Sequence, residues 1–326
     1  MNKENAKSGS FLRMLFSRNE LGALLPLALL LIVVAFVNPA FFVRRNLLDI
    51  LRTASFNFIV AMPLTFLLAS QGMDLSVGAV TSLGGIICAM ALKADIPLVF
   101  SLLLGLLAGA FIGLINGVLA IKSNLPVFIS TLGMQYVVNG AIAIMTNNVA
   151  ITNFESSFKQ LSQYRLFGEI YMPIVYALIL GVIGQVILTR TKFGREILAI
   201  GGNRETAYLA GIKVDSRRMV TFIATSTFSA LAGILMASRF ASAQPAAGTG
   251  TELSIMAAVI IGGTSMYGGQ GTVIGSALGA ILLGTITNAL ILMNVSTLWQ
   301  NFIYGLILIL ALYVDKYRRR VLSGER

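Results

Sequence analysis

Side chains that commonly do chemistry are scarce in this chain. Its 326 residues include no histidine, 13 acidic residues and a single cysteine, Cys88. Histidine is the usual proton carrier and the commonest metal ligand, and one cysteine can form neither a disulfide nor a cysteine metal cluster within a chain. We therefore expect no catalytic residue, no metal site and no bound cofactor.

One glycine-rich run, GGTSMYGGQG at 262–271, could direct backbone amides at a phosphate. A loop that binds the phosphates of ATP ends in Gly-Lys-Ser or Gly-Lys-Thr, and the chain contains no Gly-Lys pair. We interpret the run as a tight turn between two membrane helices on the cytoplasmic side. Any ATP hydrolysis must then come from another protein.

Asp74, in GMDLSVG at 72–78, is the most conspicuous acid near an apolar segment. A carboxylate at the centre of a bilayer costs about 2.5 to 3.5 kcal/mol on insertion scales, so such residues usually serve a purpose. Asp74 could be a helix N-cap that accepts hydrogen bonds from the amides of Leu75, Ser76 and Val77. The alternative is that Asp74 and Ser76 form a gate in a transport pathway.

Uncharged polar residues inside apolar segments are candidates for the wall of such a pathway, although each could equally bond one helix to another. Apart from Asp74, these segments carry almost no ionisable side chain. Carriers driven by protons or sodium usually need carboxylates or histidine at mid-membrane, so we expect the driving energy to come from a partner. The pathway candidates are Asn57, Gln71, Asn116, Gln135, Asn139 and Asn288.

The elements that must position these residues are membrane helices. The chain is 56% hydrophobic and 11% charged, and its apolar residues gather in blocks long enough to cross a bilayer. Backbone amides in lipid must be paired within their own segment, which favours helices. We expect an all-α polytopic membrane protein of about ten transmembrane helices. The predicted spans are 21–37, 55–71, 74–92, 97–121, 126–146, 171–189, 218–238, 252–267, 272–293 and 297–314.

The basic residues indicate how these spans are oriented. Most of the 24 Lys and Arg residues fall on one side if both termini are cytoplasmic, which explains the net charge of +11 better than nucleic-acid binding does. Arg44, Arg45 and Arg52 fall on the outer side and leave an eight-span arrangement open. The predicted parts are a cytoplasmic segment 1–20, a single transmembrane domain 21–314 with a cytoplasmic loop at 190–217, and a basic cytoplasmic tail 315–326.

Glycine patterns add two expectations. Glycines four residues apart form a groove that lets a neighbouring helix approach closely, and we prefer this packing role to contact with a substrate. Glycine-interrupted stretches at 69–80 and 261–275, one in each half of the chain, are compatible with a duplicated transporter that has a central pathway. The packing glycines are Gly105, Gly109, Gly113, Gly117, Gly275 and Gly279.

The loop 190–217 mixes charges, glycines and a helix-sized polar segment. A short helix at 196–200 should end at the glycine pair 201–202, and Asn203 can cap a second one that ends near residue 211. Helices this short are marginal alone in water, so another protein or the membrane domain should hold them; a solvated loop is the alternative. The face expected to seat in a partner carries Ala207, Ala210 and Gly211.

Five stretches together resemble the membrane subunits of bacterial ABC importers for monosaccharides of the ribose, allose, galactose and xylose type, and ribose permeases most closely. The resemblance covers nearly the full length. The stretches are GMDLSVG (72–78), FGREILAIGGNRETAYLAGIKV (193–214), SAQPAAGTGTEL (242–253), AVIIGGTSMYGGQGTVIGSALGA (258–280) and WQ (299–300).

The resemblance implies a homodimer in the lipid of the bacterial inner membrane, with no enzymatic activity of its own. It also implies a cytoplasmic ABC ATPase that uses ATP and Mg, and a periplasmic or lipid-anchored binding protein that delivers the sugar. A permease for another solute, such as amino acids or nucleosides, or a self-sufficient carrier, remains as an alternative. The residues placed at the coupling contact with the ATPase are Gly202, Asn203, Arg204, Glu205, Ala207, Ala210 and Gly211.

Overall fold

The computed structural model describes residues 39–123 and 125–296, with isolated residues before and after them (24, 26–28, 30–32, 34, 299, 302–303, 305–306, 309–310 and 313). The predicted segments 1–20 and 315–326 lie outside these residues. The predicted first and last spans, 21–37 and 297–314, lie largely outside them.

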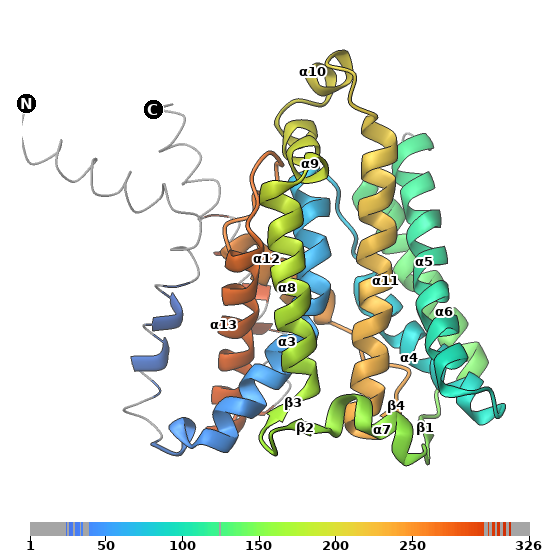
Figure 1. Ribbon diagram of the computed structural model, residues 1–326, viewed down its shortest axis with the longest axis vertical. Helices are drawn as coiled ribbons and strands as arrows, with labels where there is room; N and C mark the ends of the chain where they lie inside the picture. Colours follow the sequence, from blue (N-terminus) through green and yellow to red (C-terminus); the bar gives the residue numbers. More distant parts are fainter. Residues whose placement is uncertain are drawn as a thin grey trace, which may run out of the picture.

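The described chain is mostly helical, with four strands of two residues each (Figure 1). The strands form two antiparallel pairs, β1 with β4 and β2 with β3. In order, the elements are η1 (Pro39–Phe42), α3 (Arg44–Ala69), α4 (Val77–Lys93), α5 (Leu98–Lys122), α6 (Val127–Thr146), β1 (Ile151–Thr152), α7 (Ser156–Gln163), β2 (Arg165–Leu166), β3 (Ile170–Tyr171), α8 (Met172–Arg190), α9 (Lys192–Gly202), α10 (Arg204–Leu209), α11 (Val214–Phe240), β4 (Ser242–Ala243), α12 (Thr251–Ile261) and α13 (Val273–Leu292).

Six of the described helices are long and apolar enough to cross a membrane: α3, α5, α6, α8, α11 and α13. The predicted spans 74–92 and 252–267 correspond to shorter helices, α4 with 17 residues and α12 with 11. At 1.5 Å per residue, α12 covers about 16 Å, roughly half of a bilayer core. The expected count of about ten transmembrane helices is therefore not confirmed.

Proline or glycine sets the ends of several helices. α5 and α6 begin directly after Pro97 and Pro126. α12 ends at Ile261, before the predicted 267, because Gly262 and Gly263 follow and Gly263 has φ +95°. α3 begins at Arg44, well before the predicted residue 55, because the polar first turns still make helical hydrogen bonds outside the apolar stretch.

The helix bundle is built around α3 and α11. In α3, 83% of the most apolar stretch is buried, against 22% in α5 and 22% in α8, so the last two lie on the outside. α5 lies against α11 through its glycines: a Cβ at Gly109 would be 2.7 Å from the carbonyl oxygen of Ser226, and one at Gly113 would be 2.7 Å from that of Phe222. Gly279 of α13 lies even closer to the carbonyl of Ala258 in α12, and Gly275 to that of Gly262 directly after α12. These glycines occupy contacts that a larger residue would force open.

The two ends of the bundle differ (Figure 1). One end carries α9 and α10 and is called the α10 end; the opposite end carries α7 and the four strands and is called the α7 end. Arg52, whose place on the outer side weakened the predicted orientation, reaches the α7 end. Its Nη2 donates to the carbonyl of Ser162 (2.9 Å), and its guanidinium lies 4.0 Å from the centre of the Tyr171 ring. Arg52 therefore has a structural role there.

Two non-helical segments precede the short helices. Residues 70–76 lead from α3 into α4, and residues 244–250 lead from β4 into α12. The first coincides with the predicted interruption at 69–80. The glycine-rich run 262–271 instead forms the turn between α12 and α13, so the structural counterpart of 70–76 is 244–250 rather than 261–275.

Candidate functional site

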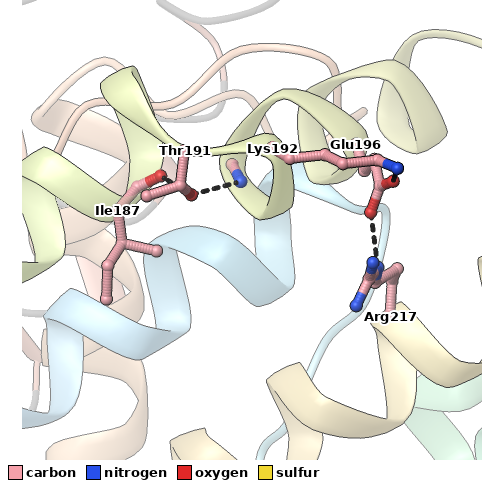
Figure 2. Close-up of polar contacts among 6 residues, drawn as sticks. Ile187, Thr191, Lys192, Glu196 and Arg217 are labelled. Atoms are coloured by element: carbon pink, nitrogen blue, oxygen red, sulfur yellow. Dashed lines mark hydrogen bonds and ion pairs between the residues drawn. The ribbon is translucent and has the colours of Figure 1, made fainter.

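The segment 190–217 forms a capped pair of helices that is fixed to the bundle. Thr191 lies between α8 and α9: its Oγ1 donates to the carbonyl of Ile187 (2.6 Å) and accepts from the amide of Gly194 (3.3 Å), as Figure 2 shows. One side chain thus closes the end of α8 and caps the start of α9. This sets the angle at which α9 leaves the membrane helix.

Glu196 fixes α9 to α11. Only 9% of this residue is exposed, and its carboxylate accepts from Nε of Arg217 on α11, while Lys192 Nζ lies 3.8 Å away (Figure 2). Arg217 also lies over the ring of Phe193, which packs against Phe66 of α3. The charges in this loop therefore serve attachment as well as solubility. Reasoning from the sequence did not single out Glu196, since its partner is 21 residues away.

α10 is held as a short capped helix. Asn203 Oδ1 accepts from the amide of Thr206 (2.9 Å), which is the N-cap expected from the sequence. Its far end closes with the Ile212 amide donating to the Ala207 carbonyl (3.1 Å), and Gly211 adopts φ +81° there. The exposed ion pair of Arg204 with Asp215 (3.0 Å) joins α10 to the start of α11.

Ala207 faces the chain itself and not a partner. It is 4% exposed and packs with Ile200 and Val214 in a small core between α9, α10 and α11. Ala210 and Gly211 are exposed. The predicted small face is therefore divided, because spacing shows which residues share a face but not which way that face turns. The free side of α10 carries Tyr208 and Leu209, at 71% and 79% exposure, which the sequence analysis missed.

Gly201, at the end of α9, lies where three backbones meet. A Cβ at Gly201 would overlap the carbonyl oxygen of Ala69 and the amide of Gly269, and that amide donates to that carbonyl (2.9 Å). Gln71 Nε2 adds bonds to the carbonyls of Gly201 (2.9 Å) and Tyr267 (3.1 Å). Gln71, a predicted pathway residue, thus joins the three backbones. Gly202 has no atom within 4 Å of an added Cβ.

This contact connects α9 to the segment that leads into α4 and to the turn that follows α12. Ala69 and Gln71 stand at the start of 70–76, which continues into α4. Gly269 belongs to the turn that follows α12. A displacement of α9 therefore acts on the chain leading to α4 and on the chain leaving α12 at one point.

Asp74 is the centre of a buried polar cluster at the start of α4. The residue has no exposed surface, and its Oδ1 accepts from the amide (2.8 Å) and hydroxyl (2.6 Å) of Ser76. Asn116 of α5 donates to both carboxylate oxygens (3.3 and 3.2 Å), and Ser226 of α11 donates at 3.4 Å. Of the three amides expected in a helix cap, only that of Ser76 is bound. Asp74 therefore ties α4 to two neighbouring helices.

The N-termini of α4 and α12 meet inside the protein. A Cβ at Gly78 would overlap the carbonyl oxygen of Gly248, and a Cβ at Gly248 would overlap that of Gly78. From this junction α4 runs to the α7 end, where Lys93 donates to the carbonyl of Asn153 (2.8 Å). α12 runs the other way, to the turn that meets Gly201. Each short helix thus covers part of the bundle's depth, in opposite directions.

Glu252 lies at this junction and was also missed. It is 9% exposed, in the first turn of α12, and its Oε2 lies against Gly78 near the start of α4. Its Oε1 accepts from Gln135 of α6 (3.0 Å), while Oε2 has no hydrogen-bond partner among the described residues. A negative charge there is favoured by the positive ends of both helices. The signal available in the sequence was a single acid at the very start of a predicted span.

The remaining predicted polar residues lie apart from the junction or are half-buried. Asn288 of α13 exchanges side-chain hydrogen bonds with Asn46 of α3 (2.8 and 3.0 Å), which is a contact between helices. Asn57 and Asn139 are half-buried on α3 and α6. In the described part of the chain, no group of three or more His, Cys, Asp or Glu residues is placed to hold a metal ion.

Helices of spanning length, two short helices that meet at their N-termini and a rigid projection at one end are the architecture of a membrane transport protein. The chain belongs to the family described as branched-chain amino acid transport system / permease component, whose model matches residues 46–312. It is a multi-pass membrane permease. No solved structure matches it.

Curated relatives cover almost the whole chain. The ribose import permease protein RbsC of Bacillus subtilis is 35% identical over 302 residues, 91% of this chain and 92% of that protein. The L-arabinose ABC transporter permease protein AraH of Azospirillum brasilense is 32% identical over 92% of this chain and 88% of its own length. The D-allose transport system permease protein AlsC of Escherichia coli is 31% identical over 91% of this chain and 92% of its own length.

Proposed function

We propose that this chain is the permease subunit of an ABC importer for a monosaccharide in the bacterial inner membrane. Its relatives in ribose, arabinose and allose transport support the cargo class. The permease acts as a homodimer, an ABC ATPase with ATP and Mg binds at the α10 end, and a sugar-binding protein docks at the α7 end. The observation that supports the mechanism is the backbone contact at Gly201. It joins the segment 190–217 to the chain before α4 and to the turn after α12.

In this mechanism the ATPase binds to α10. The exposed Tyr208 and Leu209 offer an apolar tip, and the small core around Ala207 makes α9 and α10 move together. Glu196 and Thr191 connect that motion to α11 and α8. Closure of the ATPase on ATP then displaces α9, and the Gly201 contact transmits the displacement to 70–76 and to the turn after α12. The junction of α4 and α12 changes as a result.

The proposal is tested with the complex of permease, ATPase and binding protein in proteoliposomes. Replacing Tyr208 and Leu209 by alanine removes the apolar tip and leaves the core of the segment intact. We expect weaker binding of the ATPase and a loss of sugar uptake, since a few residues carry most of the binding energy of an interface and tyrosine is enriched among them. The matched control is Leu178→Ala, which truncates another strongly exposed leucine, on α8 (68% exposed). Normal ATPase binding and uptake in the double variant would contradict the proposed role of α10.

The family is described by branched-chain amino acid transport, so branched-chain amino acids are a second candidate cargo. The two cargoes are separated by isolating the complex, identifying its binding protein and titrating it with ribose, allose, arabinose and leucine. We expect saturable binding of one sugar and none of leucine. Binding of leucine alone would overturn the sugar assignment.

A further inference from the structure

The segment 244–250, here called the lead-in segment, runs within the bundle, yet several of its residues are exposed. It starts at β4, at the α7 end, and reaches the junction where α12 begins. Gln244, Ala246 and Thr249 are exposed. The segment forms turns instead of a helix: the amide of Ala247 donates a hydrogen bond to the carbonyl of Gln244, and the amide of Thr249 donates to that of Ala246 (both 3.1 Å).

Non-helical backbone at membrane depth cannot face lipid, because lipid cannot pair its amides and carbonyls. It is tolerated only where protein covers it or where it lines a water-filled space. The equivalent segment before α4 is mostly covered by protein: Gly72 and Asp74 are buried, as are Ser70, Leu75 and Ser76, and the exposed Gln71 lies at the α10 end, where it bonds to Gly201. The exposed side of the lead-in segment therefore faces a water-filled route or the second copy of the chain in the proposed homodimer.

A cavity of about 300 Å³ lies beside the lead-in segment, between α4 and α11. This is the lower end of the usual size of small-molecule sites. Its polar groups are the hydroxyls of Thr81, Ser82 and Ser242 and the amide of Gln244, and Phe240 adds a ring that is 57% exposed. Ser82 Oγ accepts from the Gly248 amide (2.9 Å), which leaves its own proton free to donate.

The lining of this cavity contains no ionisable side chain. The cavity at α10, in contrast, is lined by Arg204, Glu205, Lys213 and Asp215. A zwitterionic amino acid would lose the hydration of two charges without a charged partner, whereas sugar hydroxyls can be satisfied by hydroxyl and amide groups. Arg239, which precedes Phe240, is not part of this lining: its guanidinium donates to Thr53 (3.0 Å) and lies over one side of the Phe240 ring, 5.1 Å from the ring centre.

We propose that the cavity between α4, α11 and the lead-in segment is a subsite for a neutral, polyhydroxylated solute on the translocation route. Gln244 and Ser82 bind hydroxyl groups there, and the Phe240 ring packs against the apolar face of the sugar. This inference rests on the proposed function and deepens it by naming where the cargo is bound in the membrane.

The first test measures access of water to the lead-in segment in the reconstituted complex. Cys88, which is fully buried, is replaced by alanine, and single cysteines are placed as Gln244→Cys, Thr249→Cys and, as control, Leu178→Cys on α8. We expect a charged, membrane-impermeant thiol reagent to label positions 244 and 249 at least about tenfold faster than position 178, because a charged reagent does not enter lipid. Labelling of 244 and 249 at the rate of 178 would overturn the proposal.

The second test measures cargo handling. Wild type and variants are assayed for uptake of radiolabelled ribose, arabinose and allose, and for ATP hydrolysis stimulated by the binding protein. For Gln244→Ala we expect uptake to fall about three- to tenfold, the effect of one lost hydrogen bond, with stimulated hydrolysis unchanged and partial recovery in Gln244→Asn. Unchanged uptake in Gln244→Ala would overturn the subsite. Uptake of none of the three sugars by wild type would instead contradict the proposed function.

Discussion

Gly201 and Gly202 are neighbours at the end of α9 with opposite surroundings. A methyl group at Gly201 would overlap two backbone atoms, whereas one at Gly202 would meet open space. Overpacking of this kind costs about 1 to 3 kcal/mol, so we expect the melting temperature of the purified protein to fall in Gly201→Ala. We expect no decrease in Gly202→Ala. Equal melting temperatures in the two variants would show that the three-backbone contact does not form.

Asp74 gives a second prediction for single residues. In Asp74→Asn the new amide cannot accept from Ser76 and Asn116 as the carboxylate does, and a buried donor left without an acceptor costs about 1 to 3 kcal/mol. We expect a lower melting temperature in detergent. Asp95→Asn is the control, since Asp95 is exposed and asparagine tolerates its φ of +58°. A loss of the same size in both variants would mean that the buried cluster contributes nothing specific.

At this scale the sequence shows which residues are unusual but not what they contact. Asp74 and Asn116 stand out as polar residues in apolar surroundings, yet their 42-residue separation hides that they bond to each other. Gln71 has the same signature as Asn116, and the structure places it at the backbone contact of Gly201. Partners so far apart in the sequence are set by helix packing, which residue type alone does not reveal.

At the scale of elements, two ion pairs attach α9 and α10 to α11 with different strength. Glu196 is mostly buried against Arg217, while the side chains of Asp215 and Arg204 are 63% and 53% exposed. Exposed ion pairs contribute little, and removing one partner of a buried pair is costly. We expect faster amide hydrogen exchange throughout α9 in Glu196→Gln and no change in Asp215→Asn. Slow exchange in both variants would contradict the attachment of α9 to α11.

Helices were predictable from the sequence where apolar length decides them, and the starts of α5 and α6 were predictable from Pro97 and Pro126. The prediction failed for α12, because the predicted span 252–267 ran through the glycine pair that ends the helix. It also missed that 70–76 and 244–250 lead to one junction. Neither segment carries a local signal for the other, since the contact of Gly78 with Gly248 depends on the packing of the whole bundle.

At the scale of the whole molecule, α10 and the β2–β3 turn must face opposite sides of the membrane. Leu209 and Phe167 are 79% and 88% exposed at these two ends. In a Cys88→Ala background, we expect Phe167→Cys to react with an impermeant thiol reagent in intact spheroplasts. In the permease expressed without its ATPase, Leu209→Cys should react only after the membrane is opened. Reaction of position 209 from outside would reverse the orientation and with it the site of the ATPase.

At the scale of the whole molecule, a displacement of α10 by the ATPase must reach the short helices through the three-backbone contact at Gly201. The most direct test is the number of ATP molecules hydrolysed per sugar imported by the reconstituted complex, compared between Gly201→Ala and Gly202→Ala. We expect the Gly201→Ala complex to hydrolyse ATP but to import much less sugar, so that this ratio rises. The Gly202→Ala complex should have the wild-type ratio. A Gly201→Ala complex with the wild-type ratio would contradict the central claim.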